Sequence, residues 1–238
     1  MRNEESALAG PWLLSAAMPQ EARLLTSRLR PREPAGRWPL WRGELGGREV
    51  WLVLTGMGLV NAACALSEAL HRLPQVAALI NLGCAGAYAK SGLGLGQAAL
   101  ASRVALADHG VRTAGRLHGL EKTGIPLLEV DGRPIYNLLP CHAGLNQRLA
   151  GPDLAVGVFA CVAQVSGDAA TAAQVEERWG AILEDMESGA AAQVAALGNL
   201  PFACLRGVSN LAGARELDVA AGAEAAQRAL FRALGEEP

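Results

Sequence analysis

The amino-acid sequence predicts an α/β fold, a single domain in which helices flank a central mixed, mostly parallel sheet. Two observations predict this class. Apolar runs of strand length alternate with stretches of helical periodicity along the chain, and glycines follow several of the apolar runs, as at Gly56 and Gly83. The length of 238 residues suits one domain. We expect that domain to cover residues 11–238, after a flexible N-terminal tail at residues 1–10.

The N-terminal part of the chain is expected to alternate strands and helices. Continuous apolar runs predict strands at 12–17, 38–45, 49–55 and 76–82, and a turn at Gly46 and Gly47 joins the middle two. A polar helix is expected over 19–30, because Pro19 occupies a permitted first-turn position. Helical periodicity predicts a second helix over 61–73 that ends before Pro74.

The C-terminal part follows the same pattern after one irregular segment. Apolar runs predict strands at 98–107, 155–165, 181–183 and 201–208, and periodicity predicts helices at 171–179, 186–197 and 219–234. Residues 108–140 are rich in Gly, Pro, Arg and His and show no clear period. We therefore expect a long loop there, and such a loop in a compact domain is usually functional.

Composition argues against several classes of function. The formal net charge of −2 gives no reason to expect a nucleic acid or a membrane as partner, and no apolar run reaches membrane-spanning length. The five cysteines show no CxxC spacing, which argues against zinc and disulfides and favours the cytoplasm. Gly56 and Gly58 lack the third glycine of a dinucleotide-binding loop. We expect no metal and no cofactor.

Two charged residues stand out at predicted strand ends, where ligands bind in such sheets. Arg206 lies inside an apolar strand, and a buried arginine needs a carboxylate partner. Glu187 opens an apolar helix. These positions predict a charged pair of Glu187 and Arg206, with a structural and a catalytic role equally open. Glu21, taken alone, reads as a solvated helix residue.

Six motifs at the strand ends resemble one family along nearly the whole chain, from about residue 12 to 234. They are AAMPQE (16–21), TGMG (55–58), NLGCAG (81–86), VSGDA (165–169), EDMES (184–188) and LRGVSN (205–210). In this order they resemble the nucleoside phosphorylase and nucleosidase superfamily. The hydrolytic branch, with its methylthioadenosine/S-adenosylhomocysteine nucleosidases and futalosine hydrolases, is the most similar part of it.

The resemblance implies roles for individual residues. Glu21 matches the glutamate that activates water, and Arg206 matches an arginine that helps to hold it. Glu187 matches the residue that binds the ribose hydroxyls. The other positions expected to contact substrate are Met18, Gly58, Cys84, Ala85, Gly86, Thr171, Asp185 and Met186. A nucleoside and water are the implied partners, and a homo-oligomer, preferably a dimer, is the implied assembly.

These residue types suit N-glycosidic hydrolysis. Its transition state carries positive charge on the sugar and negative charge on the departing base, so a carboxylate near the sugar stabilises the cation and orients water. Phosphorolysis would instead need several cations or hydroxyl groups around a phosphate. A glutamate close after the first strand, Glu21, suits water better.

Asn210 decides which purine is expected. Adenine-cleaving nucleosidases carry an aspartate there, whereas an amide can donate to a 6-oxo group and accept from a protonated N7. The stretch Ala169-Ala170-Thr171 also lacks the aromatic residue that those relatives stack on the base. The pattern therefore resembles the futalosine hydrolases, which release hypoxanthine in menaquinone biosynthesis. An adenine-cleaving nucleosidase, and a non-catalytic nucleoside-binding protein on the same fold, remain as alternatives.

The segment 108–140 carries Arg112, Arg116, His118 and Lys122. One interpretation is solvated loop charge. The other is that these residues meet an acidic 5′ extension of the substrate, because arginine binds a carboxylate with two parallel hydrogen bonds. Either His109 or His118 could also contact the substrate, whereas His142 is expected at a helix start.

Overall fold

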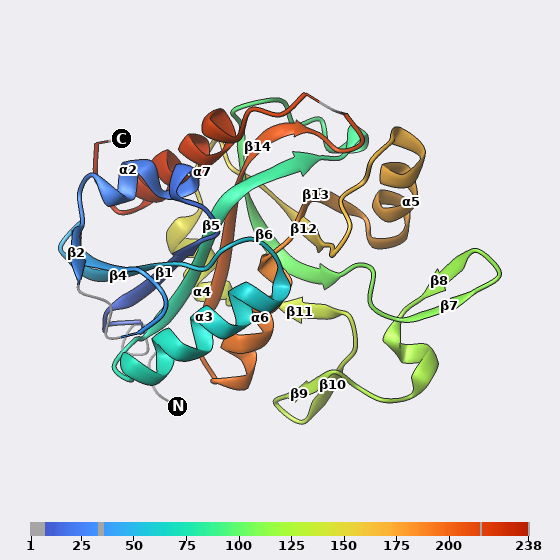
Figure 1. Ribbon diagram of the computed structural model, residues 1–238, viewed down its shortest axis with the longest axis horizontal. Helices are drawn as coiled ribbons and strands as arrows, with labels where there is room; N and C mark the ends of the chain where they lie inside the picture. Colours follow the sequence, from blue (N-terminus) through green and yellow to red (C-terminus); the bar gives the residue numbers. More distant parts are fainter. Residues whose placement is uncertain (1–7, 33–35, 215, 238) are drawn as a thin grey trace.

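The computed structural model describes residues 8–32, 36–214 and 216–237. They form one mixed sheet covered by helices (Figure 1). The strands of this sheet are β1 (Trp12–Ala16), β2 (Arg30–Arg32), β3 (Leu40–Leu45), β4 (Arg48–Leu54), β5 (Ala78–Ala87), β6 (Ala98–Leu106), β11 (Leu138–Pro140), β12 (Ala155–Cys161), β13 (Ala181–Asp185) and β14 (Phe202–Leu211). The α/β class and the mixed sheet predicted from the sequence are confirmed.

Two parallel groups of strands meet in antiparallel pairings. β4, β1, β5 and β14 pair in parallel, as do β6, β12 and β13. β13 joins β5 and β14 joins β6 in antiparallel fashion. The pairings close a ring in the order β5, β13, β12, β6 and β14. Strand ends that are far apart in sequence therefore lie next to one another on this ring.

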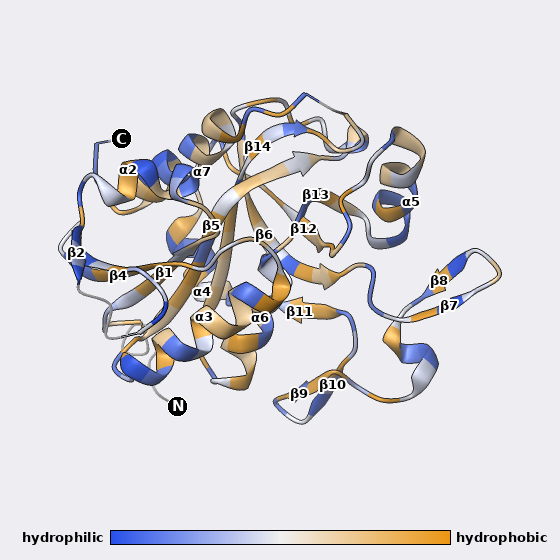
Figure 2. Cartoon of the chain, viewed as in Figure 1, coloured by the Kyte–Doolittle hydropathy of each residue, from blue (hydrophilic) through white to orange (hydrophobic). Residues whose placement is uncertain are grey.

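Helices cover both faces of the sheet. α3 (Leu59–Arg72) and α6 (Ser188–Leu197) pack on one face, and α2 (Arg23–Thr26), α4 (Ala143–Leu149) and α7 (Val219–Ala233) pack on the other. α5 (Ala169–Trp179) covers β12 and β13. In Figure 2 the central strands β5 and β14 tend toward the hydrophobic colours, as expected for strands buried on both faces. Among the described residues no helix is long and apolar enough to cross a membrane.

The segment 108–140 is not a structureless loop. It forms two hairpins, β7 (Val111–Thr113) with β8 (Arg116–His118) and β9 (Leu128–Val130) with β10 (Arg133–Ile135), around a 3₁₀ helix η3 (Leu120–Thr123). It then returns through β11 to the edge of the sheet beside β6. The β7–β8 hairpin projects from the body of the molecule (Figure 1). Strands of three residues are too short to show a period.

Several predicted boundaries were wrong. The polar helix expected over 19–30 is only a 3₁₀ turn η1 (Pro19–Ala22) followed by α2, because the residue before Pro31 disfavours helix and pairs in β2 instead. β5 and β14 run several residues past their predicted ends, and β12 ends at Cys161. Residues 1–7 of the expected tail lie outside the described residues. Leu8, by contrast, is buried and its carbonyl accepts a hydrogen bond from Trp12 Nε1.

Candidate active site

Glu21 is held rigidly at the end of β1. The 3₁₀ turn η1 places it under the backbone of β5, where its Oε1 atom accepts from Cys84 N at 2.8 Å and its Oε2 atom from Met18 N at 3.1 Å. The residue is 6% exposed. The sequence-based view of Glu21 as a solvated helix residue was therefore wrong, because a charged side chain with two backbone donors is fixed in place.

Gly83 brings Glu21 and Arg206 together. A Cβ atom at this glycine would lie 2.6 Å from Glu21 Oε1 and 3.5 Å from Arg206 Cζ. Any other residue here would have to displace the carboxylate. The two charged groups thus approach β5 over the same backbone position.

Arg206 belongs to a buried polar network. Its Nη2 atom donates to Asp185 Oδ1 at 3.2 Å and to Asn81 Oδ1 at 2.5 Å, and Asn81 in turn donates to Ser15 Oγ at 2.9 Å. Burial lowers and the Asp185 carboxylate raises the pKa of Arg206, and the net change is upward. The guanidinium therefore stays charged, although it is only 1% exposed.

One hydrogen-bond donor of Arg206 has no partner. Among the described residues its Nε atom is buried and makes no hydrogen bond. Buried donors are nearly always satisfied, so an unsatisfied N–H beside a carboxylate indicates a position for a ligand or water molecule. Glu21 offers the matching acceptor across Gly83.

Glu187 lies just past β13, at the start of α6. Its Oε1 atom accepts from Gly58 N at 2.7 Å, which links it to the turn after β4. Burial, and then the neighbouring Asp185 carboxylate, raises the pKa of Glu187 to about 7, against the opposing effect of Arg206. A carboxylate with a pKa raised by burial is a frequent mark of functional sites.

The predicted charged pair was assigned to the wrong carboxylate. Arg206 pairs with Asp185 rather than with Glu187, and Asp185 also accepts from the backbone N–H groups of Glu187 and Ser188. Asp185 is therefore part of the buried polar network around Arg206, and Glu187 has an oxygen atom left to accept hydrogen bonds from other partners.

Asn210 lies inside β14 and not in a turn after it. It pairs across the sheet with Gly86 of β5, and Gly86 pairs on its other side with Glu184 of β13. Its Nδ2 atom donates to the Leu211 carbonyl at 2.9 Å, which sets the orientation of the amide. The single hydroxyl proton of Ser209 is shared between Asn210 Oδ1, at 2.9 Å, and the carbonyl oxygen of Ala85, at 3.2 Å.

Glu184 was missed by the sequence reasoning. Its carboxylate is buried and accepts from Ser166 N, Ser166 Oγ and Tyr88 Oη at 3.0, 2.7 and 3.0 Å. The only available signal was its place in the motif EDMES, where Asp185 and Glu187 drew attention first.

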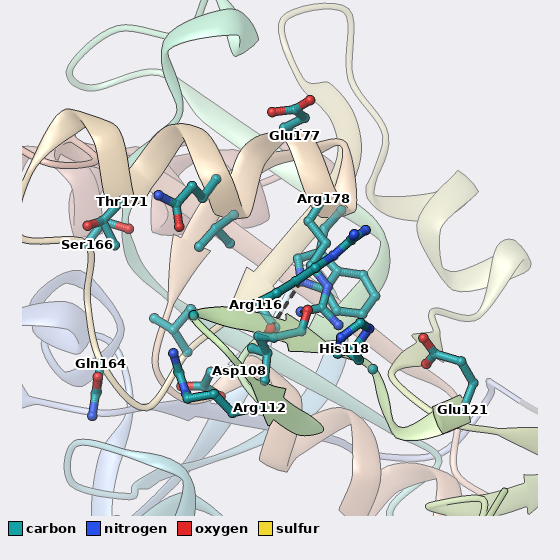
Figure 3. A pocket seen from close by; sticks show the side chains of 18 residues that line it. Asp108, Arg112, Arg116, His118, Glu121, Gln164, Ser166, Thr171, Glu177 and Arg178 are labelled. Atoms are coloured by element: carbon teal, nitrogen blue, oxygen red, sulfur yellow. Dashed lines mark hydrogen bonds between the residues drawn. The ribbon is translucent and has the colours of Figure 1, made fainter. Parts of the chain in front are cut away.

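Thr171 lies apart from the acidic cluster, in the first turn of α5. Its N–H and hydroxyl both donate to the capping residue Asp168. Together with Ser166 it lines a cavity of about 930 Å³ between α5 and the β7–β8 hairpin (Figure 3). Cations and anions both line this cavity: Arg112, Arg116, Arg178, Asp108, Glu121 and Glu177.

The thiol of Cys84 is not poised as a nucleophile. Burial, and then the Glu21 carboxylate, raises its pKa to about 12, so the thiolate is scarcely populated near neutral pH. Met186, directly before Glu187, is half-buried, and Met18 is an exposed apolar residue beside Glu21. Most of the expected site residues therefore gather at the ends of β1, β4, β5, β13 and β14, with Thr171 at the border of the cavity.

The family model described as "Phosphorylase superfamily" matches residues 12–234. The chain belongs to the phosphorylase superfamily. Among its relatives in this superfamily, a futalosine hydrolase of Thermus thermophilus is 39% identical over 177 residues, which are 74% of this chain and 75% of that protein. A 5′-methylthioadenosine/S-adenosylhomocysteine nucleosidase of Halalkalibacterium halodurans is 29% identical over 83% of this chain and 84% of the relative.

Solved structures of the superfamily share the fold. A nucleosidase of the methylthioadenosine/S-adenosylhomocysteine type from Colwellia psychrerythraea, in complex with adenine, superposes with a TM-score of 0.79 at 21% identity, covering 95% of both chains. The native structure of futalosine hydrolase from Helicobacter pylori gives a TM-score of 0.76 at 17% identity, covering 95% of this chain and 97% of that one. The predicted resemblance to this superfamily and its hydrolytic members is confirmed.

Proposed function

We propose that this protein is a hydrolytic nucleosidase that cleaves the N-glycosidic bond of futalosine and releases hypoxanthine, a step of menaquinone biosynthesis. The observation that carries the proposal is the pair of Glu21 and Arg206: both lie against the same backbone position, Gly83, and Arg206 Nε is a buried donor without a partner among the described residues. In this proposal the attacking water lies between them, where it would donate to the carboxylate and accept from Arg206 Nε. The sequence relative that is 39% identical supports the choice of substrate.

The reaction follows from the placement of these groups. The bond between C1′ and N9 lengthens first, so that positive charge grows on the sugar and negative charge on the base. Glu21 takes a proton from water as the water oxygen bonds to C1′ and the C1′–N9 bond breaks, and the departing anionic base takes up a proton from solvent at N7. Glu21 later returns its proton to solvent, so that one water is consumed overall. The carboxylate also stabilises the sugar cation electrostatically.

Glu187 is proposed to bind the sugar. Its position at the start of α6 leaves acceptor capacity beyond the bond from Gly58 N, and an ionised carboxylate can accept from two neighbouring hydroxyls. Met186, Met18 and Gly58 would border the ribose, and Ala85 and Gly86 the ribose and base. Thr171 would contact the base from α5.

Asn210 is proposed to read the base. Its amide donates to O6 and accepts from the protonated N7 of a 6-oxopurine, whereas the N6 amino group of adenine would face the amide donor. An Asn210→Asp variant should shift the preference from 6-oxopurines toward 6-aminopurines. An unchanged preference would remove Asn210 from base recognition.

The decisive experiment measures release of free base by chromatography. The panel is futalosine, its 6-amino counterpart, inosine and 5′-methylthioadenosine, each with and without phosphate. Hypoxanthine from futalosine at a phosphate-independent rate is the expected result. Adenine from methylthioadenosine as the main product would favour the alternative that the relatives at 29% identity suggest. No release from any substrate would indicate a non-catalytic binding protein.

We also propose that the protein acts in the cytoplasm as a homo-oligomer, with a dimer favoured. The cysteines of the described chain are all free, as a reducing compartment requires. Light scattering coupled to size-exclusion chromatography tests the assembly, and a monomer at micromolar concentration would contradict it.

A further inference from the structure

Glu184, Gly86 and Asn210 form one row across three adjacent strands. Gly86 on β5 pairs with Glu184 on β13 at one side and with Asn210 on β14 at the other. A Cβ atom at Gly86 would lie 3.3 Å from Asn210 Nδ2 and 3.4 Å from Glu184 Cγ. The Asn210 amide and the side chain of Glu184 therefore flank the same backbone position on the same side of the sheet.

The carboxylate of Glu184 is costly to bury. It is 5% exposed, and among the described residues no cation forms an ion pair with it. Its three donors are neutral, two from Ser166 and one from Tyr88. A buried charge without an opposite charge is uncommon in a purely structural role. Because a carboxylate offers about four acceptor positions, one position, on Oε1, remains for a further donor.

The edge of a 6-oxopurine carries an N1–H donor, an O6 acceptor and, when the leaving base is protonated, an N7–H donor. Adenine differs at two of these three positions, because its N1 is an acceptor and its N6 amino group is a donor. Asn210 complements O6 and N7. The N1 position is left for a group on the neighbouring strand, and that group must be an acceptor.

We propose that Glu184 is a specificity-determining residue that accepts a hydrogen bond from N1–H of the purine and so selects 6-oxopurines together with Asn210. The inference rests on the proposed function. An adenine base would direct the lone pair of its N1 at a carboxylate, and a buried acceptor facing an acceptor is strongly unfavourable.

Tyr88 and Ser166 keep the carboxylate in this position. Burial, and then the Glu184 carboxylate itself, raises the pKa of Tyr88, so the phenol remains a donor to Glu184. Ser166 precedes α5 and donates through both its N–H and its hydroxyl. Glu184 thereby also ties the start of α5 to the strand ends, close to Thr171.

The test compares futalosine with its 6-amino counterpart, since this pair differs only at the edge of the base. Glu184→Gln keeps the size of the side chain and can still accept from Ser166 N. We expect the ratio of kcat/KM for the 6-oxo over the 6-amino substrate to fall by about 10- to 100-fold, as for the loss of one charge-assisted hydrogen bond. The matched control is Glu129→Gln, the same substitution at an exposed position of the β9–β10 hairpin, which should keep the ratio.

A measurement on the wild-type protein does not depend on whether the variants fold. Hypoxanthine and 1-methylhypoxanthine are compared as product inhibitors, and the methyl group should weaken inhibition at least about tenfold because it removes N1–H. Equal inhibition by hypoxanthine and 1-methylhypoxanthine would refute the role of Glu184. An unchanged ratio of kcat/KM for the two substrates in a folded Glu184→Gln variant would refute it too. Neither result would contradict the proposed hydrolase activity. No base release from either substrate by the wild type would instead refute the proposed function.

Discussion

Glu187→Gln should raise the thermal stability of the protein and lower its activity. Both differences from the wild type should arise only at the pH values where Glu187 is ionised. The pKa of Glu187 rises from 4.5 to about 7 because the residue is buried and lies beside Asp185. The folded protein therefore holds this proton between about pH 4.5 and 7, where the unfolded chain has lost it. A raised carboxylate pKa means that stability is fully present below pH 4.5 and is lost as the pH rises toward and through 7.

The size of this loss can be bounded from the shift. One pKa unit corresponds to about 1.36 kcal/mol, so a rise from 4.5 to about 7 costs at most about 3 kcal/mol at pH 8. Glutamine carries no such cost. We expect Glu187→Gln to match the wild type at pH 5 and to exceed its Tm by up to about 6–12 °C at pH 8, at about 2–4 °C for each kcal/mol.

Thermal unfolding followed by circular dichroism at pH 5 and pH 8 measures the difference. The control is Glu129→Gln at an exposed position, which should show the same small change at both pH values. In the same samples kcat/KM of the wild type should rise with pH through about 7, because the ionised carboxylate binds the sugar hydroxyls, and the variant should be slow throughout. A difference in Tm between Glu187→Gln and wild type that is the same at both pH values would refute this reasoning.

Three further predictions follow from the geometry. Glu21→Gln should lower the rate of hydrolysis by about 100-fold or more. It should also cost about 1–3 kcal/mol of stability without unfolding the protein, because one backbone N–H loses its acceptor. Near-normal turnover would exclude Glu21 as the base. Gly83→Ala should displace the Glu21 carboxylate and lower kcat by about 100-fold. The control is Gly167→Ala, where a Cβ atom meets nothing within 4 Å, and it should leave kcat unchanged. Equal rates of the two variants would contradict the close approach of Glu21 to Gly83. Replacing Arg112 and Arg116 by Ala should raise KM for futalosine, whose 5′ extension ends in a carboxylate, by about tenfold and leave KM for inosine unchanged; equal changes for both substrates would assign these arginines to the solvated surface.

The sequence was sufficient for the central strands and for the fold class. Apolar runs such as 76–82 are buried on both faces, and that burial is a property of each run by itself. Where the prediction failed, the deciding interaction came from elsewhere in the chain. β14 continues through Asn210 because Gly86 of β5 offers a partner there, and no local pattern marks that continuation.

The hairpins within 108–140 could not be predicted for a related reason. Their three-residue strands carry no measurable period, and in Figure 2 the β7–β8 pair shows hydrophilic and hydrophobic colours side by side. Their position next to α5 depends on contacts such as the hydrogen bond from Arg178 to the Leu117 carbonyl. The turn between β7 and β8 contains Ala114 with a positive φ. This conformation is uncommon for residues other than glycine, so the sequence does not indicate where it occurs.

Arg206 pairs with Asp185 and not with the predicted Glu187. The two carboxylates can therefore have different roles in the site. Asp185 ends β13 with its side chain between Arg206 and the start of α6. Its Oδ1 atom accepts from Arg206 and from two backbone N–H groups, and its Oδ2 atom accepts from the Ser188 hydroxyl. Glu187 lies two residues further on, beyond the strand, and receives one backbone donor from Gly58. If Glu187 were the partner of Arg206, its pKa would fall below the ordinary value and its oxygens would be occupied. Because Asp185 neutralises the arginine instead, Glu187 keeps a raised pKa and free acceptor capacity, as a residue that must bind a ligand requires.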